Sequence, residues 1–244
     1  MLVQTRNAKW LEGAGMGLFN GPCPVCGGSK FDFLPVLWLE LITFWQLSKE
    51  EVDYINRQQG FYCCECRNNL RAMALAKAIL VTQKHSGTLL EFCGNGTILR
   101  TLEINTAGNL SAILSGLPGY KLITFPQFDL MDLRIESENF DIVIHSDCLE
   151  HVEFPVKALS ECRRVLRDGG FCIFTIPIIV GRMTRSRHGL PSSYHGQAGN
   201  VASDMLVHTE FGSDFWHAVL LAGFSVCEIV ALEFPSGLAI IARK

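Results

Sequence analysis

The chain reads FDIVIHSDCLEHV at residues 140–152 and ALSECRRVLRDGGFCIFTIPI at residues 158–178. The first six residues are largely apolar, as expected of a strand that is buried on both faces of a parallel sheet. Pro155 suits the first turn of a helix, and Gly169-Gly170 can end that helix. The apolar run FCIFTI then indicates a second strand. This order predicts two parallel strands joined by a crossover helix.

The segments on either side continue the alternation of strands and helices. Ser48 and Glu51 have the spacing of a capping box and should start a helix. The ranges expected as strands are 88–92, 120–125, 140–145, 171–176, 224–226 and 237–242, and the ranges expected as helices are 49–59, 69–81, 155–168 and 214–222. Together they predict an α/β fold with a doubly wound, mostly parallel sheet covered by helices on both faces.

Further motifs stand in a fixed order along the chain. The glycine-containing segment LLEFCGNGT occupies residues 89–97, and Asp129 precedes Asp141 by twelve residues. Together with residues 140–178, this order resembles class I S-adenosylmethionine-dependent methyltransferases, typified by the ubiquinone-biosynthesis enzymes. The resemblance covers about residues 86–244. It implies a Rossmann-like methyltransferase sheet with S-adenosylmethionine as the cofactor.

The resemblance also implies which residues contact the cofactor. Asp129 would accept a hydrogen bond from the adenine amino group. The implied cofactor-binding residues are Glu91, Gly94, Asn95, Gly96, Asp129, Leu130, His145, Ser146 and Asp147. The family's loop reads acid-x-Gly-x-Gly-x-Gly, and its first glycine is absent here. The acid that would bind the ribose hydroxyls is also missing near Thr124-Phe125-Pro126.

Two C-x-x-C pairs lie in the first third of the chain. Two residues between two thiolates allow both sulfurs to reach one ion, and two such pairs complete a closed tetrahedral zinc site of the structural kind. The expected ligands are Cys23, Cys26, Cys63 and Cys66. The alternatives are a redox pair or unligated thiols. Cys64 becomes a ligand only if the second pair is shifted by one residue.

The division of the chain follows from these motifs. We expect residues 1–85 to form a zinc-binding region and residues 86–244 to form the methyltransferase domain. The segments CPVCG, WQLSKEEVDYINRQQGFYC and CRNNLRAMALAKAI in the first region resemble a bacterial subgroup of these methyltransferases that carries an N-terminal zinc ribbon. The resemblance therefore implies two cofactors, S-adenosylmethionine and a structural zinc ion.

Candidate groups for the acceptor site lie in the long segment after the fifth expected strand. A base is needed to remove a proton from a hydroxyl acceptor, and we predict His195 first and His208 second as this catalytic base, with a hydrogen-bonded structural histidine as the alternative. Arg182 and Tyr194 are the candidate substrate-binding residues, although a solvated basic loop remains the other reading of the arginines. Asp147, Glu150 and His151 could bind a divalent cation, or they could orient the cofactor loop and cap the next helix.

Composition limits the remaining choices. The formal net charge is −3, which supplies no basic field and disfavours nucleic acid as a partner. The longest apolar run is about twelve residues, too short for a membrane-spanning helix, and no secretory signal opens the chain. We therefore expect a cytoplasmic enzyme without a membrane span. Its expected reaction transfers a methyl group from S-adenosylmethionine to a hydroxyl or amine of a small-molecule or glycan-type acceptor. The alternative is a degenerate, non-catalytic methyltransferase-like scaffold with a zinc-ribbon binding module.

Overall fold

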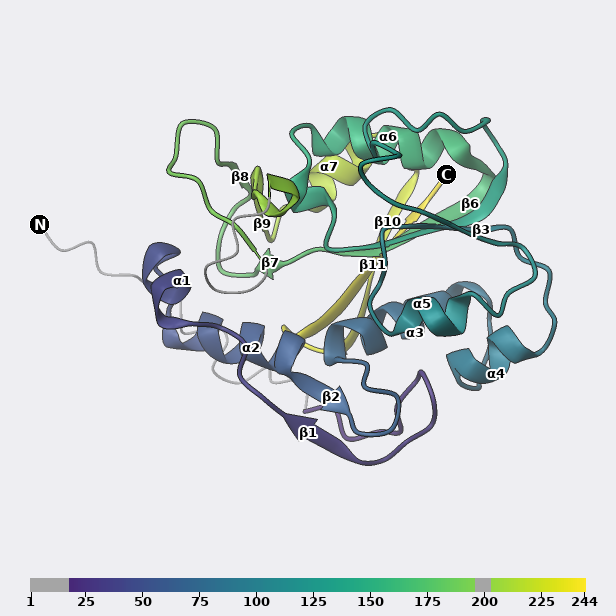
Figure 1. The fold of residues 1–244 in the computed structure, drawn as a ribbon, viewed down its shortest axis with the longest axis horizontal. Helices are drawn as coiled ribbons and strands as arrows, with labels where there is room; N and C mark the ends of the chain where they lie inside the picture. Colours follow the sequence, from purple (N-terminus) through teal and green to yellow (C-terminus); the bar gives the residue numbers. More distant parts are fainter. Residues whose placement is uncertain (1–17, 196–202) are drawn as a thin grey trace, which may run out of the picture.

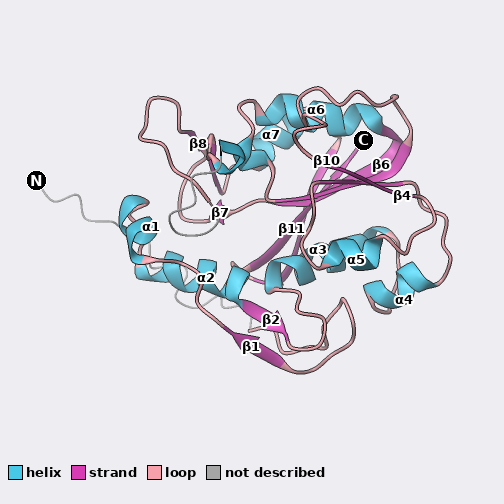
Figure 2. Cartoon of the chain, viewed as in Figure 1, coloured by secondary structure: helices cyan, strands magenta, loops and turns pink. Residues whose placement is uncertain are grey.

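The computed structural model describes residues 18–195 and 203–244. Its centre is a six-stranded sheet in the order β10-β11-β6-β5-β3-β4 (Figures 1 and 2). The strands are β3 (Thr101–Ile104), β4 (Tyr120–Ile123), β5 (Phe140–Ser146), β6 (Leu166–Thr175), β10 (Val226–Glu233) and β11 (Gly237–Arg243). The four strands from β4 to β6 run parallel, and β11 is antiparallel to both of its neighbours. The prediction of an α/β fold with a mostly parallel sheet is confirmed.

Helices cover both faces of this sheet (Figure 1). One face carries α3 (Leu70–Thr82), α4 (Leu89–Gly94) and α5 (Leu110–Leu114), and the other carries α6 (Pro155–Val165) and α7 (Trp216–Leu221). Helix α3 packs against β6, β10 and β11, and most of its residues are buried. It begins where the side chain of Asn69 accepts a hydrogen bond from the backbone N–H of Ala72, the usual way of satisfying a free amide at a helix start. Helices on both faces complete the doubly wound arrangement.

The predicted strand at residues 88–92 is wrong, because this segment begins helix α4. The Thr88 hydroxyl accepts a hydrogen bond from the Glu91 amide, and the Glu91 carboxylate accepts one from the Thr88 amide. This reciprocal capping box starts a helix. Leu89, Phe92 and Cys93 then lie on one buried face of α4, at the spacing of neighbours on a helix surface.

The N-terminal part of the chain forms a small layer of its own. It contains β1 (Phe31–Phe33), α1 (Leu39–Phe44), α2 (Lys49–Gly60) and β2 (Phe61–Cys63), with β1 and β2 paired antiparallel. The capping box predicted for Ser48 and Glu51 is confirmed at the start of α2. At its other end, Arg57 forms an ion pair with the buried Glu233 of β10. This ion pair connects α2 to β10, the edge strand of the large sheet.

A three-stranded sheet follows β6 and holds the long segment in place. Its strands are β7 (Ile178–Ile179), β8 (Arg185–Ser186) and β9 (Thr209–Gly212), in the order β7-β9-β8. The short helix η2 (Ser203–Met205) precedes β9 in the chain, and the short helix η1 (Leu149–His151), which follows β5, packs against β9. The buried Glu210 of β9 accepts hydrogen bonds from Arg185 and Arg187. These arginines are therefore held by a carboxylate.

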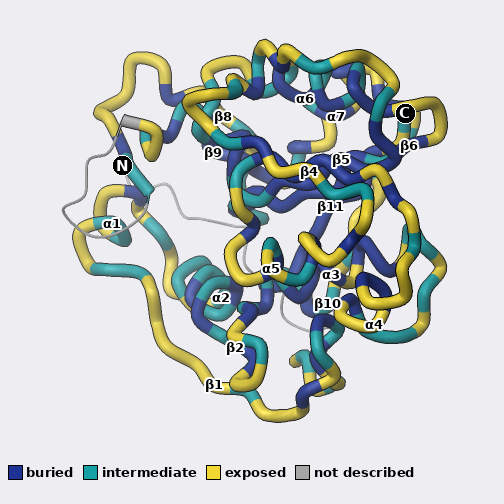
Figure 3. Tube along the Cα trace, turned by 45° about the vertical axis from the view of Figure 1, so that its right-hand side comes forward, coloured by how far each residue is buried: buried dark blue, intermediate teal, exposed yellow. Residues whose placement is uncertain are grey.

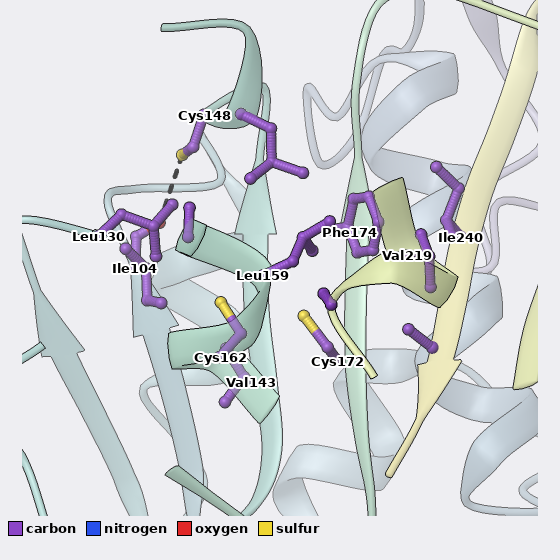
Figure 4. Close-up of a cluster of buried hydrophobic side chains, with 14 of the residues drawn as sticks. Ile104, Leu130, Val143, Cys148, Leu159, Cys162, Cys172, Phe174, Val219 and Ile240 are labelled. Atoms are coloured by element: carbon purple, nitrogen blue, oxygen red, sulfur yellow. Dashed lines mark hydrogen bonds between the residues drawn. The ribbon is translucent and has the colours of Figure 1, made fainter. Parts of the chain in front are cut away.

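One buried hydrophobic cluster joins residues before and after position 85, and Figure 3 shows buried stretches of the chain in α3 and in the strands of the large sheet. Leu75 and Ile79 of α3 belong to the same buried cluster as Ile142, Ile173 and Ile241 of the sheet. The cluster on the other face includes Cys148, Cys162 and Cys172, which pack among apolar side chains such as Phe174 (Figure 4). Because α3 packs on the large sheet, the packing shows no boundary between two domains near residue 85. The division of the chain at that residue stays a prediction.

One further expectation differs in detail from the structure. Helix α6 ends at Val165, before Gly169, because the chain turns into β6 at Leu166. Gly169 has a φ of +74° within that strand, a conformation that glycine adopts without steric cost. In residues 18–195 and 203–244, no helix is both long enough and apolar enough to cross a membrane.

Candidate functional site

A cavity of about 900 Å³ opens at the carboxyl ends of β3 and β5. Open α/β sheets bind ligands at this edge, and the volume lies near the upper end of the range of roughly 300–1,000 Å³ for small-molecule sites. The sheet contributes the residues that follow β3, β4 and β5, while α1 and α2 form the opposite wall. The cavity is thus enclosed between the large sheet and the N-terminal layer.

The turn after β3 is ordered by a buried carboxylate. Glu103 has no exposed surface, and its Oε1 accepts hydrogen bonds from the Ala107 amide at 2.7 Å and the Ser111 hydroxyl at 2.6 Å. Asn105 has a φ of +55°, in the left-handed region that favours glycine or asparagine. Its side chain accepts a hydrogen bond from the Phe125 amide at 3.0 Å. Asn105 and Thr106 line the cavity, so this turn brings backbone to the cavity wall.

The segment after β4 contributes two of the predicted residues. Asp129 and Leu130 both line the cavity. Leu130 is buried, whereas Asp129 is exposed and accepts a hydrogen bond from the Met131 amide at 2.8 Å. Phe125 also lines the cavity, beside the position where the ribose-binding acid was missing from the sequence. A carboxylate and apolar surface therefore lie together on this side of the cavity.

Four of the predicted cofactor residues do not reach the cavity. Glu91, Gly94, Asn95 and Gly96 belong to α4 and the turn after it, and none of them is among the residues that line the cavity. The Glu91 carboxylate is occupied by its hydrogen bonds to Thr88. The structure therefore places the glycine turn after the predicted strand away from the carboxyl edge of the sheet. The turn after β3 occupies that position.

His145 is also outside the cavity lining, although it precedes two residues that are inside it. Its side chain is fully buried in β5 and stacks on Phe174 with ring centroids 4.7 Å apart. Neither ring nitrogen has a hydrogen-bond partner among the described residues. Burial lowers the pKa of His145 to about 3, so the imidazole is neutral in the folded protein near pH 7.

The buried imidazole predicts a dependence of stability on acid. An unfolded histidine has a pKa of about 6.5, so below that pH the unfolded chain binds a proton that folded His145 rejects until about pH 3. The free energy of unfolding should therefore fall as pH drops below about 6.5, by up to about 1.4 kcal/mol per pH unit from this group. The free energy of unfolding, measured by urea titration at pH 7, 6 and 5, should fall less steeply with decreasing pH for His145→Phe than for the wild type. The exposed His217→Phe is the control, and equal slopes in all three proteins would contradict the assignment.

The end of β5 carries a half-buried ion pair. Asp147 has a φ of +48°, and its carboxylate pairs with Arg71 of α3 and accepts a hydrogen bond from the Thr175 hydroxyl at 3.1 Å. Ser146 shares a hydrogen bond of 2.8 Å with the same Thr175 hydroxyl. Ser146, Asp147 and Arg71 all line the cavity. The Asp147 carboxylate is therefore already satisfied and fixes the position of the Arg71 guanidinium.

Both predicted base candidates line the cavity on the side of the N-terminal layer. His195 lies against Trp45 with ring centroids 5.5 Å apart, and the Trp45 indole N–H donates to Ser193 at 2.7 Å. Burial lowers the pKa of His195 to about 4. His208 is half-buried, and its amide donates to the carbonyl oxygen of Glu150 at 2.7 Å. The two imidazoles therefore flank the turn after β5.

The two predicted substrate-binding residues lie elsewhere. Arg182 donates to both carboxylate oxygens of Glu51, at 2.9 and 2.7 Å, and to the carbonyl oxygens of Trp45 and Gln46. Its guanidinium is therefore used to hold the start of α2. Tyr194 forms an isolated backbone bridge with Leu206. Neither Arg182 nor Tyr194 is among the residues that line the cavity.

The four cysteines of the two C-x-x-C pairs gather at one point. The Sγ atoms of Cys23 and Cys66 lie 3.7 Å apart, as do those of Cys26 and Cys63, and all four lie within 4.8 Å of one another. Tetrahedral zinc with Zn–S bonds of about 2.3 Å places sulfurs about 3.8 Å apart. The two pairs form the same turn, since Gly27 and Arg67 both have positive φ angles and donate to the carbonyls of Cys23 and Cys63. Cys64 is exposed and outside the group.

Several residues of the site were not anticipated from the sequence. The turn residues Glu103 and Asn105 were missed. A signal was present, because the spacing of Thr88 and Glu91 is that of a capping box and indicates a helix at residues 89–94. The segment TLEI at residues 101–104 is then the first strand. Arg71 and Trp45 carried no local signal, because they reach the cavity only through contacts between distant parts of the chain.

The family comparison covers the central part of the chain. Residues 90–174 match the family described as "Methyltransferase domain". This segment is a methyltransferase domain. It extends from α4 to β6 and so includes the turns after β3, β4 and β5 that line the cavity. No curated protein matches the chain.

Solved structures are similar over more of the chain, at low sequence identity. The chain is similar to the 1,6-didemethyltoxoflavin-N1-methyltransferase of Burkholderia thailandensis, solved with 1,6-didemethyltoxoflavin and S-adenosylhomocysteine, at 14% identity over 88% of this chain and 96% of that chain, with a TM-score of 0.42. It is also similar to an S-adenosylmethionine-dependent methyltransferase of Thermotoga maritima, at 15% identity over 72% of this chain and 97% of that chain, with a TM-score of 0.40.

Proposed function

We propose that the chain transfers a methyl group from S-adenosylmethionine to a hydroxyl or amine of a small-molecule or glycan-type acceptor. The observation that carries the proposal is the match of residues 90–174 to a methyltransferase domain, in a chain whose large cavity opens at the carboxyl edge of the parallel strands. Ligands of open α/β sheets bind at this edge. The absence of the family's first loop glycine and of the ribose-binding acid near Phe125 is the basis of the alternative, a non-catalytic methyltransferase-like scaffold with a zinc-ribbon binding module.

The cofactor fits the half of the cavity formed by the sheet. Backbone at Asn105 and Thr106 would contact the methionine part, in place of the glycine turn first expected at Gly94 and Gly96. Asp129 would accept a hydrogen bond from the adenine amino group, with Leu130 against the ring. Ser146 would lie near the sulfonium. When bound, S-adenosylmethionine supplies an electrophilic methyl group.

The acceptor would then occupy the half of the cavity beneath α1 and α2. Trp45, Leu41 and Ile55 give this wall an apolar surface that excludes water from the reacting atoms. A hydroxyl acceptor loses its proton to a base as its oxygen attacks the methyl carbon in line. His195 and His208 are the proposed bases, because both imidazoles face the cavity. Arg182 is not part of this proposal, because its guanidinium is bound to Glu51.

A structural zinc ion is proposed at Cys23, Cys26, Cys63 and Cys66. The sulfur separations match the edges of a zinc tetrahedron, and four protein ligands leave no open position for chemistry. The ion would hold β1 and β2 together and thereby fix the start and end of the segment that contains α1 and α2. The resemblance to a zinc-ribbon subgroup of methyltransferases supports the same assignment.

Calorimetry with S-adenosylmethionine and with S-adenosylhomocysteine tests the proposed function on the full chain. Saturable binding of about one molecule of each per chain is expected for a single cofactor site. Absence of binding at millimolar ligand would overturn the methyltransferase proposal and favour the non-catalytic scaffold. Screening hydroxyl and amine acceptors for production of S-adenosylhomocysteine would then identify the acceptor class.

Replacement of Asp129 by Ala should weaken cofactor binding. Loss of a hydrogen bond to a charged acceptor costs about 1–3 kcal/mol, or roughly 5–150-fold in Kd. Asp129→Asn keeps an acceptor for the Met131 amide. It therefore removes the charge of Asp129 without removing the hydrogen bond that orders the turn. The control is Asp132→Ala, because the Asp132 side chain is 66% exposed and outside the cavity lining. An unchanged Kd for Asp129→Ala, measured by calorimetry, would remove Asp129 from the adenine site.

A further inference from the structure

We propose that Glu150, His151 and His195 bind a divalent transition-metal ion in the wall of the cavity. The Oε1 atom of Glu150 lies 3.6 Å from Nε2 of His151 and 3.8 Å from Nδ1 of His195. One ligand atom from each residue lies within 4.8 Å of the other two. This site is separate from the four cysteines, and it replaces the cation site that the sequence suggested at Asp147, Glu150 and His151.

Among residues 18–195 and 203–244, the Glu150 carboxylate has no hydrogen-bond partner that explains its burial. Its side chain is 1% exposed, and neither oxygen accepts a hydrogen bond from any described residue. Removing a bare carboxylate from water is costly unless a charge compensates it. Arg71 is nearby, but its guanidinium is paired with Asp147. A bound cation would balance the charge of Glu150, whereas the competing explanation is a neutral, protonated carboxyl group.

His151 is oriented as metal-binding histidines are. Its Nδ1 lies 3.0 Å from the carbonyl oxygen of Leu206, an atom that only accepts, so Nδ1 carries the proton and donates. The lone pair is then on Nε2, the nitrogen that faces Glu150. Metal-ligating histidines usually donate their second N–H to a carbonyl or carboxylate in this way, which fixes the tautomer and the ring orientation.

The distances suit a shared ion better than direct hydrogen bonds. The two nitrogen–oxygen separations exceed the usual limit of about 3.2 Å for an N–H···O bond. A tetrahedral ion with bonds of about 2.0–2.1 Å separates its ligand atoms by about 3.4 Å, a few tenths of an ångström less than observed. Two imidazoles and one carboxylate form the ligand set of catalytic zinc and non-haem iron sites. Because all three residues line the cavity, the open coordination position faces the acceptor.

The metal site has a chemical consequence that rests on the proposed function. An ion at this position would bind an acceptor oxygen and lower the pKa of a hydroxyl, which favours an alcohol or phenol over an amine as the methyl acceptor. The oxygen–carbon bond forms as the sulfur–carbon bond breaks, and the hydroxyl proton passes to His208. His195 then acts as a ligand, and its Nδ1 is no longer available as the base.

Metal content of the full chain tests the site. After loading with Zn²⁺ and dialysis, the wild type should retain about two ions per chain, one at the cysteines and one at the new site. Glu150→Ala and His195→Ala should each retain about one ion. His217→Ala is the matched control, since His217 is exposed and outside the cavity lining, and it should retain about two. Replacement of zinc by Co²⁺ gives each site its own absorption spectrum.

The outcomes separate this proposal from the proposed function. Loss of one ion in both variants, with circular dichroism and S-adenosylhomocysteine binding unchanged, supports the site. A wild type that retains only one ion after loading, or variants that keep both, would overturn it and leave Glu150 as a protonated carboxyl group. His195 is the second variant because its side chain is 25% exposed and its loss threatens folding less. A failure of the wild type to bind S-adenosylhomocysteine would count against methyl transfer alone.

Discussion

Replacing Cys63 with Ser is expected to lower the zinc content and the melting temperature of the protein together. Structural zinc contributes about 10–16 kcal/mol of apparent binding free energy in small zinc domains. A loss of only a third of it, about 3–5 kcal/mol, would lower the melting temperature by roughly 6–20 °C at about 2–4 °C per kcal/mol. Cys63 is buried at the end of β2 and lies next to Cys26 in the cluster, so a weaker ligand there opens the site. Scanning calorimetry and elemental analysis measure both effects.

Cys64→Ser is the matched control for this experiment. Cys64 is the next residue in the chain, but its side chain is exposed and outside the cysteine group. Its replacement should change neither the zinc content nor the melting temperature. If Cys63→Ser retained as much zinc as the wild type and melted at the same temperature, Cys63 would not be a zinc ligand. Loss of the metal in Cys64→Ser but not in Cys63→Ser would mean that the second pair is shifted to Cys64.

Arg57→Ala is expected to destabilise the protein strongly. The Glu233 side chain is 2% exposed and pairs with Arg57, whose Nη2 donates to it at 2.7 Å. Removing one partner of a buried ion pair leaves an uncompensated charge and typically costs about 3–5 kcal/mol. Urea unfolding at pH 7 should show this loss as a lower midpoint. The damage should be concentrated where α2 meets β10, because the pair joins these elements.

Two controls isolate the buried charge from the loss of the arginine side chain. The double variant Arg57→Met with Glu233→Met removes both charges and should recover most of the stability, since apolar replacements of buried pairs are often neutral. Arg134→Ala breaks an ion pair whose side chains are 87% and 66% exposed, and exposed pairs contribute about 0–1 kcal/mol. A single variant as stable as Arg134→Ala would show that Glu233 is not held by Arg57.

Much of the fold could be predicted because its elements carry local signals. The strand β5 is a continuous apolar run, α6 begins at Pro155, and α2 begins at a capping box, so each could be recognised without its neighbours. The two cysteine pairs could also be recognised from a local pattern, the C-x-x-C spacing. In the structure their four sulfur atoms lie close together. Asp129, Leu130, Ser146, Asp147, His195 and His208 were all predicted for the site, and all line the cavity.

The strand predicted at residues 88–92 was wrong because two signals competed. The glycines at residues 94 and 96 resembled the family's loop, whereas the turn after β3 has its positive φ angles at Asn105 and Gly108 and lacks alternating glycines. The Thr88 and Glu91 side chains satisfy the first amides of α4 and thereby favour a helix over a strand. Arg71, Trp45 and the wall formed by α1 and α2 depend on contacts between residues far apart in the chain, which no local pattern encodes.

Helix α2 connects the cysteine cluster to the cavity, and this connection makes the two sites thermodynamically dependent on each other. Gln58 and Gln59 line the cavity, and only a few residues later the chain reaches Cys63. A ligand that binds more tightly when α2 is in place must, by reciprocity, raise the affinity of the cysteines for their ion by the same free energy. The rate at which a chelator removes zinc would then report on occupancy of a cavity that contains none of the four cysteines.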